Sequence, residues 1–237
     1  MTKRFRTALY WTILLTVIIW GVFFIDHALG RRLSFWYGLQ PREIAGLIGI
    51  GTSPFLHSGW SHLLSNTPPF LSLTGLLIFF YPRLWPRVLT SLWLVTGALV
   101  WLLARPSTHI GASGVIFALA AFLGFSGFFR RDFRAIVVSL LVLFYYGGMV
   151  TGVLPGQEGI SWESHLFGFL WGIGSAYLFR NELEDHEILA RQKAAQRHAE
   201  QPAESAFLDP NTFQETKQER QERAFWEKIQ EAARKRE

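Results

Sequence analysis

Three short motifs contain the side chains of this 237-residue chain that could do chemistry together. A serine hydroxyl is a weak nucleophile until a neighbouring base removes its proton, and a neutral histidine is the side chain that most often does so. Ser113 and His165 are the candidates for these two roles. His62 and Asn66 are four residues apart, so on a helix they share one face and can donate hydrogen bonds to one developing oxyanion. The motifs are His-Leu-Leu-Ser-Asn (62–66), Gly-Ala-Ser-Gly (111–114) and His-x-x-Gly (165–168).

Long apolar runs must position these motifs, and their length indicates that lipid is the solvent. Half of the residues are apolar and 16% are aromatic. A helix needs about 17 to 25 apolar residues to cross a hydrocarbon core roughly 30 Å thick. Six stretches reach or approach that length, which predicts an all-α polytopic membrane protein with six spans. The stretches are residues 8–25, 62–81, 88–104, 113–129, 135–154 and 165–179.

The basic residues of the short connections predict the orientation, because Lys and Arg are retained on the cytoplasmic side. Nine of them fall on one side of the six stretches and four on the other. This orientation places both termini in the cytoplasm. The candidate side chains of the second, fourth and sixth stretches then lie near the external ends of these stretches, at the same depth in the membrane. Polar residues inside a membrane are costly and are functional candidates by default. The long connection 30–61 mixes aromatic and aliphatic residues with arginines, so we expect it at the external interface.

The fourth stretch gives a second indication of chemistry at Ser113. It has 17 apolar residues, and at about 1.5 Å per residue it falls a few Å short of the hydrocarbon core. The preceding loop must therefore dip below the surface and place Ser113 at a submerged helix N-terminus, where free N–H groups and the helix dipole favour an oxyanion. Gly111 and Gly114 allow a tight turn and close backbone approach there. Gly168 allows the sixth helix to approach closely and to bring His165 to Ser113.

Residues 8–180 resemble the rhomboid intramembrane proteases, in the three motifs and in the spans that carry them. The resemblance implies a six-helix bundle, a Ser-His dyad without an acid, an oxyanion site that uses the serine backbone, and single-pass membrane proteins as substrates. It implies that the dyad is Ser113 and His165, and that His62 and Asn66 are oxyanion donors. His57 matches a histidine with a supporting role in that family. The chain departs from the family in two ways. Phe117 replaces a tyrosine that often stacks on the dyad histidine, and Pro68 with Pro69 should kink the second helix.

Other readings of the same residues remain open. Four histidines (57, 62, 109 and 165) raise the possibility of a metal site, but there is no His-Glu-x-x-His motif and no carboxylate in the six stretches, so we expect no metal and no cofactor. We interpret His109 as a loop residue, and Glu158 and Glu163 as external loop residues. The glycine-rich segment 152–161 could act as a mobile lid. A rhomboid-like protein that binds membrane clients without cutting them, or a small transporter, is the alternative function.

The remaining residues, 181–237, predict a charged cytoplasmic tail that is partly helical or disordered. Residues 1–180 contain 13 basic and 5 acidic residues, whereas the tail contains 10 and 13. The basic excess thus follows membrane topology and contact with lipid, and it does not indicate nucleic acid. In the tail, Phe225, Ile229 and Ala233 form an apolar stripe that could dock on a cytoplasmic partner or be an incidental feature of a solvated helix. We expect the chain in the plasma membrane of a bacterial-type cell.

Overall fold

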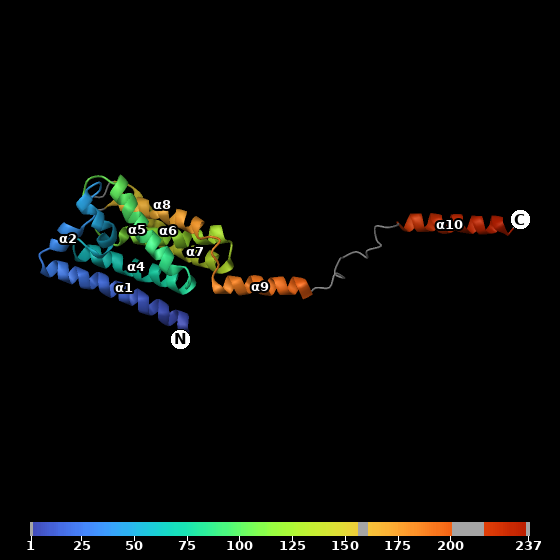
Figure 1. Ribbon diagram of the computed structural model, residues 1–237, viewed down its shortest axis with the longest axis horizontal. Helices are drawn as coiled ribbons and strands as arrows, with labels where there is room; N and C mark the ends of the chain where they lie inside the picture. The colour runs from blue at the N-terminus through green and yellow to red at the C-terminus, as the bar shows by residue number, and fades with distance from the viewer. Residues whose placement is uncertain (1, 156–160, 201–215, 236–237) are drawn as a thin grey trace. The chain divides into compact units, whose positions relative to one another are not determined.

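The computed structural model describes residues 2–155, 161–200 and 216–235, and these residues form helices with no strand beyond one isolated bridge between Leu39 and His109. The chain divides into two units, Met1–Asp185 and His186–Glu237 (Figure 1). The first unit contains all the long apolar helices and the candidate site.

Five stretches of the described chain are long and apolar enough to cross a membrane. They are α1 (Lys3–Ala28), α4 (Trp60–Phe80), α5 (Trp85–Leu103), α6 (Ser113–Arg130), and α7 (Phe133–Tyr146) together with the 3-10 segment η3 (Gly147–Val153). The sixth stretch that the sequence predicted to span corresponds to α8 (Trp162–Leu178), which has 17 residues. Five of the six predicted stretches therefore have the length and composition of a membrane span, and the crossing of α8 stays a prediction. The fifth predicted helix, residues 135–154, differs from the structure in that its last part is 3-10 helix.

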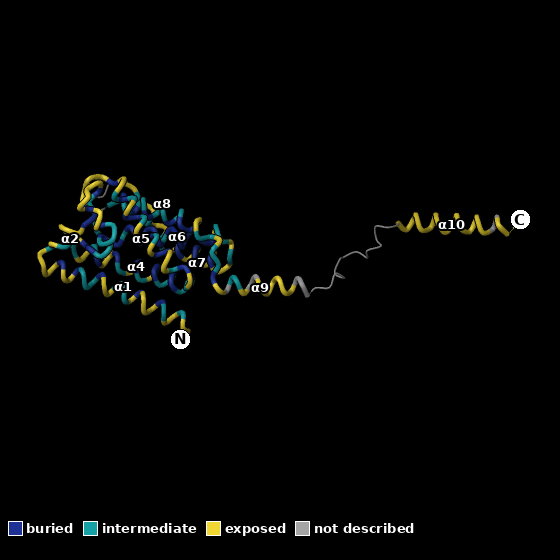
Figure 2. The backbone as a smooth tube through the Cα atoms, viewed as in Figure 1, coloured by how far each residue is buried: buried dark blue, intermediate teal, exposed yellow. Residues whose placement is uncertain are grey.

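Helix α6 is the centre of the first unit. Twelve of its 18 residues are buried, and it packs against α4, α5, α7 and α8. Figure 2 shows this burial in the middle of the bundle, whereas many residues of α1 and α7 are exposed. A helix surrounded by helices needs small residues where backbones approach, and α6 has glycine or alanine at six positions, including Gly114 and Ala118.

Helix α4, which carries His62 and Asn66, is fixed mainly by α1. The Trp20 indole N–H donates to the Thr67 hydroxyl at 3.1 Å, and the Phe23 and Trp60 rings meet edge to face with centroids 4.9 Å apart. Pro68 lies inside the helix, immediately before a second proline, and the Ser72 hydroxyl donates to its carbonyl at 2.8 Å. The helix continues to Phe80 in spite of both prolines.

The long connection between α1 and α4 is folded. It contains α2 (Arg32–Tyr37), η1 (Ile44–Ile48), α3 (Gly49–Thr52) and η2 (Ser53–Phe55). The buried Asp26 carboxylate accepts hydrogen bonds from the Leu33 N–H at 2.9 Å and the Ser34 N–H at 3.1 Å, so it caps α2 and ties the connection to the end of α1. Many of its large apolar side chains are exposed, as a segment in the membrane interface requires: Phe35, Trp36, Tyr37, Ile44, Leu47 and Ile48.

The segment that follows α8 packs on the first unit at the end opposite to the motifs. The Glu184 carboxylate, 1% exposed, accepts hydrogen bonds from the backbone N–H groups of Arg83 and Leu84 before α5. The Arg130 guanidinium donates to the carbonyl of Glu182 at 2.7 Å. The first residues of the segment expected to be tail therefore belong to the membrane unit.

The second unit contains most of α9 (Asp185–Glu200) and all of α10 (Lys217–Arg234). In α10, Phe225 and Ile229 are exposed, as in the stripe that the sequence indicated. Figure 2 shows α10 exposed along its length.

Candidate active site

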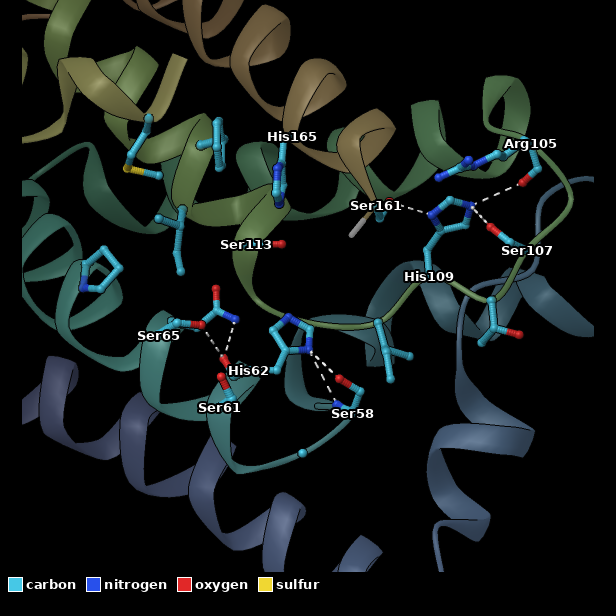
Figure 3. Close-up of a pocket in the computed structure, with 18 residues that line it drawn as sticks. Ser58, Ser61, His62, Ser65, Arg105, Ser107, His109, Ser113, Ser161 and His165 are labelled. Atoms are coloured by element: carbon cyan, nitrogen blue, oxygen red, sulfur yellow. Dashed lines mark hydrogen bonds between the residues drawn. The ribbon is translucent and has the colours of Figure 1, made fainter. Parts of the chain in front are cut away.

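A cavity of about 840 Å³ opens at the end of the first unit where α4, α6 and α8 begin. Figure 3 shows His62, Ser113 and His165 projecting into it, and Asn66 and Phe117 also line it. Five side chains that the sequence selected from three separate helices thus share one cavity. The neighbouring walls come from the loop before α6 and from the residue before α8, and they include Arg105, Ser107, His109 and Ser161.

Backbone contact between α6 and α8 brings the Ser113 and His165 segments together. A Cβ atom built on Gly168 would lie 2.1 Å from the Gly114 carbonyl oxygen, and one built on Gly172 would lie 2.4 Å from the Ala118 oxygen. A Cβ on Gly114 would lie 3.2 Å from the Ser164 oxygen. Glycines 114 and 168 therefore flank a direct contact of the two helices, one residue after Ser113 and three after His165.

The His165 ring is held in one orientation and one tautomer. Its Nδ1 lies 2.9 Å from the Gly152 carbonyl oxygen, which can only accept, so Nδ1 carries the proton. Nε2 of the neutral ring is then an acceptor, and it has no hydrogen-bond partner among the described residues. The Phe117 ring stacks on it with centroids 4.1 Å apart and planes 6° from parallel. The stacking expected of Phe117 is present without a hydroxyl.

Ser113 and His165 line the same cavity, but among the described residues no hydrogen bond joins their side chains. Transfer of a proton between them therefore requires a further approach of the hydroxyl and the free Nε2 atom. Catalytic hydrogen bonds commonly shorten only when substrate is bound.

His62 faces the turn before Ser113 as a hydrogen-bond donor. The Ser58 backbone N–H donates to His62 Nδ1 at 3.4 Å, so the ring proton is on Nε2. Gly111 has a φ of 115°, and a Cβ atom there would lie 2.5 Å from His62 Cε1. Only glycine allows this backbone conformation together with this close ring contact. Asn66 is 7% exposed and donates one amide hydrogen to the His62 carbonyl at 2.8 Å, which leaves its second amide hydrogen for the cavity.

His57 lies behind the turn and outside the cavity lining. Its Nε2 accepts from the Ala112 N–H at 3.5 Å, and its Nδ1 donates to the Phe55 carbonyl at 3.4 Å. Burial, and then the neighbouring His62, lower the pKa of His57 to about 4, so the ring is neutral at pH 7 and can accept. The Gly111 N–H donates to the Ser53 carbonyl at 2.9 Å. The two residues before Ser113 are therefore anchored away from the cavity, and Ser113 begins α6, where the first N–H groups have no intrahelical partner.

Sequence reasoning missed a polar cluster beside these residues. His109 does lie in a loop, but it is 3% exposed and bonds to Ser161 across the cavity wall. Glu163 was expected in an external loop, and this is wrong: it stands in the first turn of α8, is 4% exposed, and forms an ion pair with Arg105 at 2.7 Å. The signal for this cluster was the serine directly before the apolar run of α8, since serine is a preferred N-cap. Glu158 and most of the segment expected to be a lid lie outside the described residues.

No group of three or more His, Asp or Glu side chains in the described parts of the chain could hold a metal ion. His57 and His62 are neighbours, with ring centroids 5.0 Å apart, and both His57 nitrogens and the Nδ1 atom of His62 bond to protein groups as described above. The chemistry that this arrangement can support is proton transfer and hydrogen-bond donation around a serine hydroxyl.

The fold and the site define a polytopic helical membrane protein with a serine and a histidine in a cavity at one end of its bundle. The Rhomboid domain family matches residues 45–182, and the chain belongs to the rhomboid family of integral, multi-pass membrane proteins. Uncharacterized proteins of Mycobacterium tuberculosis and Mycobacterium bovis are 36% identical to it over 208 residues, which cover 83% of this chain and 86% of each relative. An uncharacterized protein of Mycobacterium leprae is 39% identical over 151 residues, 60% of this chain and 59% of the relative. The resemblance stated from the three motifs is thus confirmed at the level of the family.

Proposed function

We propose that this chain is an intramembrane serine endopeptidase that cleaves single-pass membrane proteins. The observation that carries the proposal is the state of His165: its Nδ1–H is bound to the Gly152 carbonyl and its face to Phe117, so its free Nε2 is the atom available to a serine in the same cavity. A base in this fixed tautomer is what a serine nucleophile requires.

In the proposed reaction, the Ser113 oxygen attacks the carbonyl carbon of the substrate peptide bond while His165 Nε2 takes the hydroxyl proton. The Ser113 backbone N–H, His62 Nε2–H and the second Asn66 amide hydrogen stabilise the oxyanion, and each donor contributes about 3 kcal/mol by comparison with other oxyanion sites. The proton then passes to the leaving amine, and an acyl-enzyme remains on Ser113. A water molecule, deprotonated by His165, hydrolyses this ester and restores the hydroxyl.

Most of the residues that line the cavity are polar, and the cavity lies at helix ends, which supports cleavage near one membrane surface and not at the bilayer centre. Peptide bonds inside a helix are shielded, so the substrate segment must partly unwind, and small or helix-breaking residues at the cut site are expected to favour cleavage. No cofactor enters this scheme.

The deciding experiment compares Ser113→Ala with Ser126→Ala in purified protein reconstituted with a single-pass reporter substrate. Ser126 lies on the same helix and its hydroxyl donates to the Phe122 carbonyl at 2.6 Å, so its loss perturbs α6 without touching the cavity. Ser113→Ala should abolish cleavage while the protein remains folded and inserted, and Ser126→Ala should remain active. Cleavage by Ser113→Ala would refute the proposal. Wild-type protein that binds the reporter and never cuts it would favour the client-binding alternative.

The orientation in the membrane is a second part of the proposal. Both termini are cytoplasmic, and the cavity opens to the outside of a bacterial plasma membrane. The tail is then free to bind a cytoplasmic partner. The chain has no cysteine, so single cysteines can be introduced without background. In intact cells, a membrane-impermeant maleimide should label Glu43→Cys in the first connection and spare Lys228→Cys in α10. The reverse labelling pattern would overturn the orientation.

A further inference from the structure

A hydrogen-bonded cluster next to the cavity joins the segment before Ser113 to the segment before His165. His109 is four residues before Ser113, and Ser161 is four residues before His165. His109 Nδ1 lies 2.5 Å from the Ser161 hydroxyl, and Figure 3 shows this contact on the cavity wall beside Ser113. The proposed reaction uses neither residue.

The direction of each hydrogen bond follows from groups that can act in only one way. His109 Nε2 lies 3.2 Å from the Arg105 carbonyl oxygen, so Nε2 donates. Burial lowers the pKa of His109, which keeps the ring neutral at pH 7 and leaves Nδ1 as an acceptor. Ser161 must then donate its hydroxyl hydrogen to Nδ1. Its oxygen accepts from the Ser164 N–H at 3.3 Å and lies 2.6 Å from the Ser164 hydroxyl.

One end of this connection is anchored to Leu39, and the other end is anchored to the first turn of α8. The His109 N–H donates to the Leu39 carbonyl at 2.8 Å, and the Leu39 N–H donates back at 3.1 Å, so the loop cannot shift independently of the buried Leu39. Ser161 is the N-cap of α8, and its carbonyl accepts from the His165 N–H at 3.3 Å. A movement of Ser161 therefore moves the start of the helix that carries His165.

A second bridge runs in parallel between the same two segments. The Arg105 Nε atom lies 2.7 Å from the Glu163 carboxylate, whose side chain is 5% exposed. Arg105 precedes His109 by four residues, and Glu163 follows Ser161 by two residues. The hydrogen bond and the ion pair together fix the distance between the loop before α6 and the start of α8.

We propose that His109 is a positioning residue for the Ser113–His165 pair, and that it acts through its hydrogen bond to Ser161. This inference rests on the proposed protease activity. The hydrogen bond sets the separation of two side chains that share the cavity without bonding to each other, and misplacement of reacting groups by 1 Å costs about 100-fold in rate. The Ser161 hydroxyl hydrogen and the His109 Nδ1 lone pair are both used in this hydrogen bond.

The test is a double-mutant cycle on the full-length protein, with kcat and KM measured on a reconstituted single-pass reporter. His109→Ala and Ser161→Ala should each lower kcat by about 10- to 100-fold and leave KM within about 2-fold. The double variant should lose no more than the more damaging single variant, because both substitutions remove one shared interaction. Ser161→Thr, which keeps the hydroxyl and the N-cap, should retain most of the wild-type kcat.

The matched control is Ser139→Ala in α7. Ser139 is also a buried serine that joins two elements, since its hydroxyl donates to the Leu123 carbonyl at 2.7 Å and accepts from the Gly127 N–H at 2.8 Å. It lies near the other end of α6, so its loss should lower the unfolding midpoint and leave kcat unchanged. Circular dichroism at the assay temperature establishes that every variant compared is folded.

Wild-type kcat in His109→Ala, or single losses that multiply in the double variant, would overturn the positioning role. A fall in kcat of the same size in Ser139→Ala would also overturn the positioning role, because the loss of any contact between two helices would then be enough to lower kcat. Failure of the proposed function is a different result: it is cleavage by Ser113→Ala, whatever His109 does.

Discussion

Gly168→Ala tests directly whether backbone contact between α6 and α8 sets the geometry of the site. The added Cβ would lie 2.1 Å from the Gly114 carbonyl oxygen, and side-chain carbons do not approach other atoms closer than 3.0 Å. The obstructing atom belongs to the backbone, so no side-chain rotation can relieve the clash. The two helices must separate by about 1 Å at a point one residue from Ser113 and three from His165, a strain that overpacked sites meet with a loss of about 1 to 3 kcal/mol of stability.

Two measurements follow from this separation. The unfolding midpoint of the detergent-solubilised protein should fall, even though alanine is intrinsically better than glycine inside a helix by up to about 1 kcal/mol. The kcat on a single-pass reporter should fall by about 100-fold, the cost of a 1 Å misplacement of reacting groups. The first measurement is independent of the proposed function.

Gly174→Ala is the matched control for this substitution, because it makes the same change on the same helix. Its Cβ would meet the nearest atom, Cε3 of Trp171, at 3.5 Å, an ordinary contact. Stability and kcat should stay near the wild-type values. If Gly168→Ala behaves like Gly174→Ala, or if both are equally damaged, the close contact does not position the two side chains and the reasoning is refuted.

Three further predictions concern other parts of the first unit. The pKa of His57 is about 4 in the folded protein and 6.5 in the unfolded chain, so the unfolded chain binds more protons between pH 4 and pH 6.5. The contribution of His57 to the free energy of unfolding should therefore be complete above pH 6.5 and fall by at most about 3 kcal/mol toward pH 4. The unfolding midpoint should change less between pH 6.5 and pH 4 in His57→Gln than in the wild-type protein, and equal changes in the two proteins would contradict this prediction. Phe117→Ala should lower kcat by removing the ring stacked on His165, whereas Phe117→Tyr should retain it; equal rates for the two variants would show that stacking is dispensable. Glu184→Ala should cost about 1 to 3 kcal/mol, because it removes the buried carboxylate that accepts from the Arg83 N–H before α5. Arg87→Ala removes only the exposed ion pair with Glu182 and should cost less than about 1 kcal/mol; equal losses in chemical denaturation would contradict this ranking.

Much of the site was readable from the sequence, because the informative features are local. The types and spacing of His62 and Asn66, the glycines around Ser113, and the short apolar run that begins there all follow from neighbouring residues. These features also sufficed to identify the family. The roles assigned to these residues stay proposals, and the structure adds that their side chains line one cavity.

The errors and omissions arose where a residue's environment depends on a distant partner. Glu163 was expected in an external loop, and it is buried in the first turn of α8, where Arg105 reaches it from the loop before α6. Glu182 and Glu184 were counted with the charged tail, and they pack on the membrane unit because Arg83, Leu84 and Arg130 present donors there. A pattern of residue types cannot show which distant donor a carboxylate meets.

The sequence by itself sufficed to identify a membrane-spanning rhomboid chain and to single out the serine and histidine proposed for its chemistry, because span length, charge bias and motif spacing are properties of contiguous residues. Only the tertiary structure decided that His165 bonds to the Gly152 carbonyl and that His109 bonds to the Ser161 hydroxyl, across 13 and 52 residues of chain. The physical reason is that the proton position on an imidazole is set by the group facing its other nitrogen. That group is chosen by how the helices pack.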